Sequence, residues 1–297
     1  MSAVATTPGI TRRLLLASRP VSWINTAFPF AAAYLMTTRH IDAELIIGTI
    51  FFLVPYNLAM YGINDVFDFE SDAANPRKGG IEGALLDQRL HRSTIVTAVA
   101  VCLPFVIALV VLGTPLSWIV LAVSLFAVAA YSVPGLRFKE VPFLDSATSS
   151  THFTSPAAYG LILAGAHFTP QLICILVAFF LWGIASHAFG AVQDIEPDRA
   201  GRIASIATVM GGAWTVRFSI GSWTCAGILM FFTPWPGPIA AVLVVPYIAL
   251  ATPFAKITDE DSGRANRGWR RFIWVNYACG FLATLLLIAY ALEGTAP

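Results

Sequence analysis

Carboxylates recur at helical spacing just after an apolar run, in the stretch MYGINDVFDFESDAANPRK (residues 60–78). On a helix, each residue advances by about 100°, so Asn64, Asp65, Asp68 and Asp72 share one face. Carboxylates at the edge of an apolar segment repel one another and lose hydration, so a positively charged partner is expected to meet them. We call these four residues the first acidic row, and their pattern predicts a cation site.

A second acidic row, Asp194 and Asp198, repeats the four-residue spacing in QDIEPDRAGRIAS (residues 193–205). Pro197 makes a regular helix through this row conditional, because proline strains the turn before it. Two rows of oxygen ligands suit a hard divalent cation. Magnesium typically takes one or two carboxylates together with waters and substrate phosphates, so a phosphate-bearing substrate is implied.

Basic residues accompany both rows and the Pro-Gly turn between them. Arginine offers paired hydrogen bonds to phosphate oxygens and lysine offers a point charge. The candidates for binding a diphosphate are Arg77, Lys78, Arg137, Lys139, Arg199 and Arg202. Arg77, Lys78, Arg137 and Lys139 each have the alternative role of anchoring the chain at a membrane surface. A diphosphate held by magnesium and by these cations becomes a good leaving group.

The composition requires a membrane environment for these rows. Hydrophobic residues make up 57% of the 297 residues and charged residues only 12%, which does not describe a soluble surface. We predict an all-α, multi-pass membrane helical bundle of about nine transmembrane helices around a central cavity. The expected spans are residues 21–38, 43–63, 94–112, 116–133, 145–166, 170–190, 213–232, 236–252 and 271–292.

The basic residues predict the orientation of the bundle. Of the eighteen lysines and arginines, only Arg39 falls on the side opposite the N-terminus in this arrangement. The positive-inside rule then places the N-terminus and the loops with the acidic rows in the cytoplasm, in a cell-membrane protein. A net charge of +1 without a basic cluster facing aromatic residues argues against nucleic acid as a partner.

The loops suggest an internal repeat, because each half offers one acidic and one basic loop to the same side. We therefore predict a single domain, residues 1–297, made of two diverged four-helix halves and a ninth helix. The span from residue 145 is unusual, since SATSSTHFTS (residues 146–155) is rich in hydroxyl groups. If it crosses the membrane, this segment is expected to face other helices or a polar cavity.

Four stretches resemble one known family. NDVFDFESD (residues 64–72) matches the NDxxDxxxD signature of the UbiA superfamily of intramembrane prenyltransferases, and QDIEPDRAGRIASIATVMG (residues 193–211) resembles its second motif. YSVPGLRFK (residues 131–139) is similar to the loop that the family carries between the two motifs. SRPVSW (residues 18–23) resembles its usual opening. The resemblance covers nearly the whole chain, in the right order.

The resemblance implies magnesium-dependent transfer of an isoprenoid chain from its diphosphate, inside a helical bundle with a lateral opening to membrane lipid. Carried over residue by residue, magnesium and diphosphate would be held by Asn64, Asp65, Asp68, Asp72, Asp194 and Asp198. Phosphate oxygens would be bound by Arg77, Lys78, Lys139 and Arg202, and Tyr131 would face the reacting carbon. Where many relatives have a further Asp, this chain has Ala191, which leaves fewer ligands on the second row.

Within the superfamily, SHAFGAVQDIEPDRAGRIASIATVMGG (residues 186–212) looks most like the lycopene elongase branch. That likeness implies dimethylallyl diphosphate as donor and lycopene as acceptor. The alternative acceptors are an aromatic quinone precursor and a tetrapyrrole. A cation-coupled transporter is the alternative from another class, because intramembrane Asp and His residues also mark ion paths.

Overall fold

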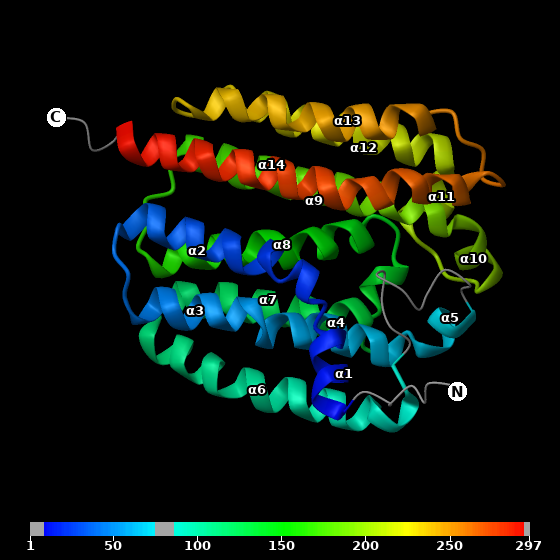
Figure 1. Ribbon diagram of the computed structural model, residues 1–297, viewed down its shortest axis with the longest axis horizontal. Helices are drawn as coiled ribbons and strands as arrows, with labels where there is room; N and C mark the ends of the chain where they lie inside the picture. The colour runs from blue at the N-terminus through cyan, green and yellow to red at the C-terminus, as the bar shows by residue number, and fades with distance from the viewer. Residues whose placement is uncertain (1–8, 75–85, 294–297) are drawn as a thin grey trace, which may run out of the picture.

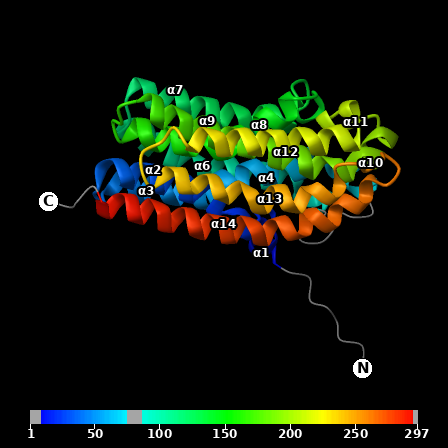
Figure 2. The same cartoon turned by 90° about the horizontal axis from the view of Figure 1, so that it is seen from above.

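Long helices lying side by side along one direction make up the molecule (Figure 1; Figure 2 shows them from above). The computed structural model describes residues 9–74 and 86–293, apart from the side chains of Ser71, Asp72 and Ala74. Within these ranges there is no strand, so the all-α prediction is confirmed for them. The longer elements are α2 (Ile24–Thr38), α3 (Ala43–Leu53), α4 (Pro55–Phe67), α6 (His91–Leu112), α7 (Pro115–Ser132), α8 (Leu144–Leu163), α9 (Pro170–Ala191), α12 (Gly212–Met230), η5 (Gly237–Val244), α13 (Val245–Ala251) and α14 (Asn266–Glu293).

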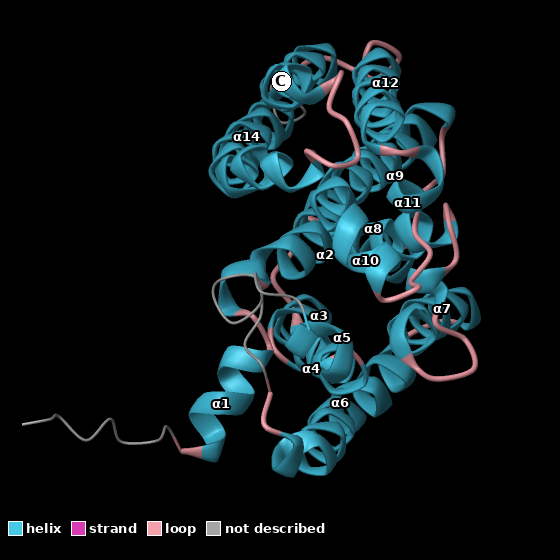
Figure 3. Cartoon of the chain, turned by 90° about the vertical axis from the view of Figure 1, so that its right-hand side faces the viewer, coloured by secondary structure: helices cyan, strands magenta, loops and turns pink. Residues whose placement is uncertain are grey.

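Three of the short helices gather at one end of the bundle. They are α5 (Phe69–Ala74), α10 (Ile195–Ala200) and α11 (Ile206–Met210), which lie at the right of Figure 1 and face the viewer in Figure 3. The others are α1 (Ile10–Ala17) and the 3-10 turns η1 (Pro20–Ser22), η2 (Gln88–Leu90), η3 (Phe138–Glu140), η4 (Val192–Asp194), η6 (Thr252–Phe254) and η7 (Ser262–Ala265). The stretches that contain the two rows, residues 64–72 and 193–211, are called the first and second acidic motifs. Because α5 belongs to the first motif and α10 to the second, both motifs lie at the same end.

Each predicted span coincides with helical structure. Six stretches within the described residues are long and apolar enough to cross a membrane: Ala43–Phe67, Gln88–Leu112, Pro115–Ser132, Pro170–Ala200, Gly237–Phe254 and Ser262–Glu293. The other three expected spans correspond to α2, α8 and α12. The 15-residue α2 extends only about 22 Å, less than the hydrocarbon core of a bilayer. A multi-pass membrane protein is therefore established, while nine crossings stay a prediction.

A proline divides the second expected span into α3 and α4. Pro55 has no N–H and begins α4, so backbone carbonyls near the end of α3 lack their usual helical donors. Asn57, which is fully buried, donates its side-chain amide to the carbonyls of Phe52 and Leu53 at 2.8 and 3.0 Å, and to Thr26 Oγ1 of α2 at 2.7 Å. The asparagine thus both repairs the break and joins α4 to α2, as intramembrane amides often do.

The hydroxyl-rich helix α8 lies inside the bundle, where it packs against α2, α7 and α9. Its polar residues Ser146, Ser150, His152 and Thr154 are buried. Ser150 donates to the carbonyl of Phe180 on α9 at 2.7 Å, and Thr154 donates to the carbonyl of Ser150 at 2.7 Å. The prediction that this segment faces other helices is confirmed, because hydroxyl groups that bond backbone carbonyls carry little penalty away from water.

Two apolar clusters divide the buried core. One joins α2, α3, α4, α6 and α7 to the Tyr159 end of α8, and its largest side chains include Phe30, Phe51 and Phe52. The second joins α9, α12, α13 and α14 around Trp223 and Tyr247. These clusters hold the two acidic motifs on separate parts of the bundle. The predicted repeat of two four-helix halves stays a prediction.

Candidate functional site

The first acidic row lies where α4 ends. Asn64 and Asp65 belong to α4, which stops at Phe67, and Asp68 occupies the junction before α5. The backbone N–H of Asp68 still bonds to the carbonyl of Asn64 at 2.9 Å, so helical geometry persists to this point. The expected continuous helix through the row is therefore interrupted after Asp68. The Asp72 side chain, together with Arg77 and Lys78, falls outside the described residues.

Basic and polar groups from other helices meet this row. Arg19 Nη2 lies 2.8 Å from Asp65 Oδ1, and its guanidinium also stands 4.4 Å from the centre of the Tyr61 ring. The ammonium of Lys139 pairs with the carboxylate of Asp68. Ser132, at the end of α7, donates to Asn64 Oδ1 at 2.9 Å. Positive charge is expected here because buried carboxylates without cations would be costly. The ion pairs of Asp65 and Asp68 confirm this expectation.

The second acidic row lies across a junction of two short helices. Asp194 ends the 3-10 turn η4, and Asp198 lies in α10. Pro197 is in the first turn of α10, where a missing N–H costs nothing, so it permits a short helix but not a continuation of α9. Both carboxylates are half-buried. Asp194 and Asp198 therefore project from one compact turn rather than from one regular helix face.

Lys139 connects the two rows. It lies in η3, between α7 and α8, and pairs with Asp68 of the first row. Burial lowers the pKa of Lys139 to about 8, whereas the carboxylates of Glu140 and Asp198 act to raise it. The charge of Asp198 in the second row thus acts on the same ammonium that pairs with Asp68 in the first row. One ammonium thus interacts with carboxylates that are 130 positions apart in the sequence.

A chain of polar contacts joins the same helices slightly deeper in the bundle. Tyr131, beside Ser132 at the end of α7, has its hydroxyl 3.1 Å from His187 Nε2 on α9. Ser146 Oγ of α8 lies 3.0 Å from His187 Nδ1, so both ring nitrogens have partners. The ring of His152 meets Tyr131 edge to face, with centroids 5.4 Å apart. Tyr131 therefore lies at the polar centre of the bundle, between the helices that carry the two rows.

Two predicted phosphate ligands have other contacts, and a third is exposed. Arg199 donates to the carbonyl of Thr208 at 2.8 Å and pairs with Asp259 at 2.8 Å. Arg137 pairs with Glu140, three residues along. Arg202 is exposed, with its backbone in the left-handed region at φ 57°. These contacts give no support to a diphosphate role for Arg137 or Arg199, so Lys139 is the basic residue that the geometry favours among the described candidates.

Sequence reasoning missed Arg19 and Asp145. The motif SRPVSW contained the first signal, but its arginine reads as one more membrane anchor until the fold brings it to Asp65. Asp145 is fully buried and accepts the backbone N–H groups of Ser146 at 2.6 Å and Ile206 at 2.7 Å. It therefore ties the start of α8 to the start of α11, just after the second row. An aspartate at the start of a hydroxyl-rich helix gave no sign of this distant partner.

The oxygen donors of the first row suit the predicted magnesium ion, but the described side chains do not surround it completely. Among the side chains that the structure describes, no three His, Cys, Asp or Glu residues are grouped so as to hold a metal. A complete protein cage is therefore absent from this part of the chain. Magnesium binds instead through one or two carboxylates and substrate phosphates, and the oxygens of Asn64, Asp65 and Asp68 are of that chemical type. The residues fit magnesium that arrives with a diphosphate.

The fold and the site define a membrane-embedded helical bundle with a polar, doubly acidic centre at one end. Residues 26–276 match the UbiA prenyltransferase family. The chain belongs to this family and is a prenyltransferase. The prediction of the family from the motifs is confirmed, and the transporter alternative is not supported.

Individual relatives resemble the chain over nearly its whole length. The C(50) beta-cyclic carotenoids biosynthesis protein LbtBC of Dietzia sp. is 50% identical over 283 residues, which are 95% of this chain but 66% of the Dietzia protein. A lycopene elongase/hydratase of Corynebacterium glutamicum is 48% identical over 278 residues, or 94% of this chain and 97% of that protein. A UbiA homolog from Archaeoglobus fulgidus, bound to DMAPP and Mg2+, shares the fold with a TM-score of 0.65 at 16% identity, covering 90% of this chain and 98% of that one.

Proposed function

We propose that this prenyltransferase moves a dimethylallyl group from dimethylallyl diphosphate to lycopene, with magnesium as cofactor. The relative from Corynebacterium glutamicum is named for lycopene elongation, and the one from Dietzia sp. for making carotenoids. The Archaeoglobus homolog of the same fold binds DMAPP and Mg2+. An aromatic quinone precursor or a tetrapyrrole, the alternative acceptors, has no such support among these relatives.

The observation that carries the proposal is the position of Lys139 between the two acidic rows. Lys139 pairs with Asp68, and the charge of Asp198 also acts on it, which supports a site where a diphosphate and its metal would meet carboxylates of both rows. In the proposed complex, magnesium is held by Asn64, Asp65, Asp68, Asp72, Asp194 and Asp198. Lys139, with Arg77, Lys78 and Arg202, contacts phosphate oxygens. When bound, magnesium would neutralise the diphosphate and so favour its departure.

The reaction then needs the deeper part of the site. The C–O bond to the diphosphate breaks, and the terminal double bond of the acceptor attacks the allylic cation to form a C–C bond. The resulting tertiary cation either loses a proton to give an alkene or takes up water and loses a proton to give an alcohol. We assign to Tyr131 the stabilisation of the positive charge, because the face of an aromatic ring attracts cations. Its bond to His187 fixes the ring.

The proposed location is the cell membrane, with the N-terminus and the acidic motifs in the cytoplasm. The distribution of lysines and arginines supports this orientation. A cytoplasmic site would also give a charged, water-soluble diphosphate direct access without crossing the membrane.

The test is an acceptor screen on membranes that contain the full chain. With labelled dimethylallyl diphosphate, magnesium and lycopene, we expect labelled carotenoids longer by five carbons, and EDTA should abolish their formation. Parallel reactions replace lycopene with a hydroxybenzoate, a naphthoate or a tetrapyrrole. Labelling of one of these while lycopene stays inert would overturn the acceptor. Loss of all labelling, with protein present, would overturn the proposed donor.

A further inference from the structure

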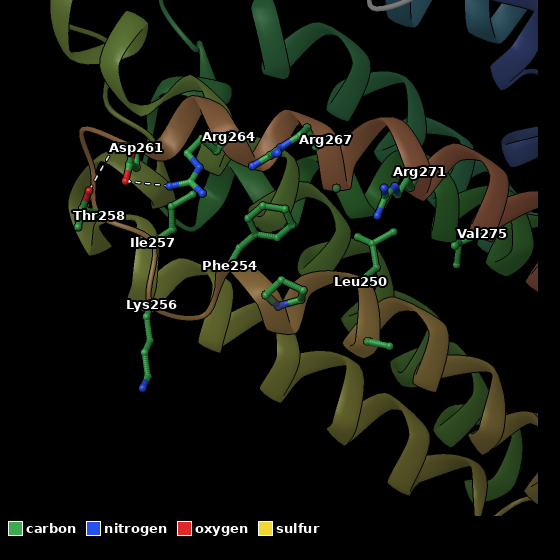
Figure 4. Close-up of a pocket in the computed structure, with 13 residues that line it drawn as sticks. Leu250, Phe254, Lys256, Ile257, Thr258, Asp261, Arg264, Arg267, Arg271 and Val275 are labelled. Carbon is green, nitrogen blue, oxygen red and sulfur yellow. Dashed lines mark hydrogen bonds and ion pairs between the residues drawn. The ribbon is translucent and has the colours of Figure 1, made fainter.

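A surface groove of about 670 Å³ lies between α13 and α14, near the end of the bundle that carries the acidic motifs (Figure 4). Leu250, Pro253 and Phe254 form the wall from α13 and η6, and Gly268 and Val275 belong to the wall from α14. The function proposed above does not use this groove. Its lining combines apolar and basic side chains, and none of the lining residues belongs to either acidic motif.

Positive charge dominates the polar part of the groove. Lys256, Arg264, Arg267 and Arg271 line it, and Asp261 is the one acidic residue among the lining residues. Asp261 pairs with Arg264 at 3.2 Å. Arg267 and Arg271 are four positions apart on α14, hence on one face, and no ion pair joins either of them to another described residue. Arg271 points toward Leu250 across the groove (Figure 4). Two arginines are thus exposed beside an apolar wall.

The apolar part of the groove is continuous with the lipid-facing surface. In the most apolar window of each of the stretches Gly237–Phe254 and Ser262–Glu293, only 11% of the residues are buried. Both stretches therefore lie at the periphery of the bundle. Phe254 packs against Phe189 of α9, with ring centroids 6.0 Å apart, and closes the groove toward the core. A ligand in the groove therefore has arginines at one end and a membrane-exposed hydrocarbon surface along its length.

The groove and the acidic site use different faces of α14. Asn266 donates to Gln193 Oε1 at 2.6 Å, and Gly190 of α9 approaches the Trp269 ring so closely that a Cβ there would lie 2.9 Å from it. These residues face the second acidic motif. Arg267 and Arg271 instead line the groove beside α13. The arginines therefore lie on a different face of α14 from the residues that contact α9 and the second acidic motif.

We propose that this groove binds an anionic phospholipid. The phosphate would lie between Arg267 and Arg271, with paired N–H contacts that arginine gives to phosphate oxygens. The acyl chains would lie along Leu250, Phe254 and Val275. Basic pockets between transmembrane helices are suited to anionic headgroups, and the apolar wall selects a lipid over a free phosphate. The proposal does not depend on which isoprenoid or acceptor the enzyme uses.

The test measures lipid binding to the full chain in detergent by native mass spectrometry. Delipidated protein is titrated with dioleoyl phosphatidylglycerol and, separately, with dioleoyl phosphatidylcholine. We expect phosphatidylglycerol to bind more tightly, and the double variant Arg267→Gln/Arg271→Gln to weaken its binding on the order of tenfold. Arg270→Gln is the matched control, because Arg270 is exposed on the same helix turn but does not line the groove. It should bind like the unaltered protein.

Further experiments distinguish a phospholipid site from a site for free diphosphate. Arg267→Lys/Arg271→Lys keeps the charge, so it should retain most of the binding and show that the chain still folds. Sodium pyrophosphate with magnesium should not displace the lipid. Displacement would assign the groove to a free diphosphate, and equal affinity for both phospholipids, or an equal loss in Arg270→Gln, would overturn the proposed site. Prenyl transfer is not the readout, so failure here is distinguishable from failure of the proposed function.

Discussion

Lys139 occupies a position that only the fold can give it. In the sequence it follows a turn in which the backbone N–H of Leu136 bonds to the carbonyl of Val133, with Gly135 at φ 92°, a conformation that favours glycine. That turn and η3 direct the lysine from between α7 and α8 toward the end of α4. There it pairs with Asp68 of the first motif, and the charge of Asp198 of the second also acts on it, which supports the proposed diphosphate site.

Replacing Asp68 with Asn should lower the rate of prenyl transfer at least about a hundredfold. The change keeps the size of the side chain but removes the charge that faces Lys139 and that would bind magnesium, and losses of this kind cost about 3 kcal/mol. The rate is measured with labelled donor at saturating magnesium. Asp42→Asn is the control. Asp42 accepts the N–H of Leu45 at the start of α3 and the hydroxyl of Tyr34 at 2.9 Å, and an asparagine can still cap the helix with its carbonyl oxygen while its amide donates to the Tyr34 oxygen. Full activity of Asp68→Asn would contradict the proposed site.

Tyr131 has two separable features, its ring and its hydroxyl. Tyr131→Phe keeps the ring but loses the contact with His187, whereas Tyr131→Ala loses both. If the ring stabilises the cation, the alanine variant should be about thirtyfold slower than the phenylalanine variant, which corresponds to about 2 kcal/mol for a desolvated cation–π contact. Single-turnover rates with both variants check this. Equal rates would assign the effect to the hydroxyl group instead.

The types of residue in the site were more predictable than their partners. Asn64, Asp65 and Asp68 stood out because carboxylates beside an apolar run need an explanation. Arg19 and Asp145 did not, since a single arginine before a helix and a single aspartate at its start are ordinary features of membrane chains. Their roles depend on contacts across 46 and 61 positions, to Asp65 and Ile206. Spacing along one helix carries no information about such contacts.

At the scale of elements, breaks in helices were harder to predict than helices. Charge-free apolar length predicted helical structure at every expected span, because a membrane requires backbone groups to be satisfied within the segment, and six of these stretches are long and apolar enough to cross. The divisions at Pro55 and after Asp68 depend on local hydrogen bonds, such as those of Asn57 to Phe52 and Leu53. The 3-10 geometry of η5, Gly237–Val244, is likewise invisible in an apolar run that suits an α-helix equally well.

The loop before α14 offers a prediction at this scale. The pKa of Asp259 is lowered chiefly by the N–H of Gly212, which donates to it at 2.7 Å, and also by Arg199. A carboxylate with a lowered folded pKa stabilises the protein above its ordinary pKa, about 3.9, and this contribution is lost as pH falls through the folded value. Asp259→Asn should therefore lower the Tm at pH 7, and the difference should shrink as the pH is lowered toward 3.

Tryptophan fluorescence during heating in detergent measures this difference. Asp261→Asn is the control on the same loop, because Asp261 pairs with Arg264 where both side chains are more than half exposed, and such pairs contribute little. A Tm difference for Asp259→Asn that does not change between pH 7 and pH 3 would show that the charge of Asp259 has no role.

At the scale of the whole molecule, the chain brings two distant acidic motifs to the same end of one bundle. The first motif begins in the last turn of α4, the second follows α9, and Figures 1 and 3 show α5 and α10 at that common end. This arrangement makes the orientation of the bundle a functional property, because the end with the acidic motifs must face the side that supplies the diphosphate.

The orientation can be tested with single cysteines in a variant from which Cys102, Cys174, Cys225 and Cys279 have been removed. Gly263 lies in η7, near the acidic end, and an added Cβ there meets nothing within 4 Å. His167 is exposed in the connection between α8 and α9, at the other end. In intact cells, a membrane-impermeant maleimide should label His167→Cys but not Gly263→Cys, and in inverted vesicles the pattern should reverse, because positively charged loops are retained in the cytoplasm. Labelling of Gly263→Cys in intact cells would place the acidic motifs outside, where they could not receive a cytoplasmic diphosphate.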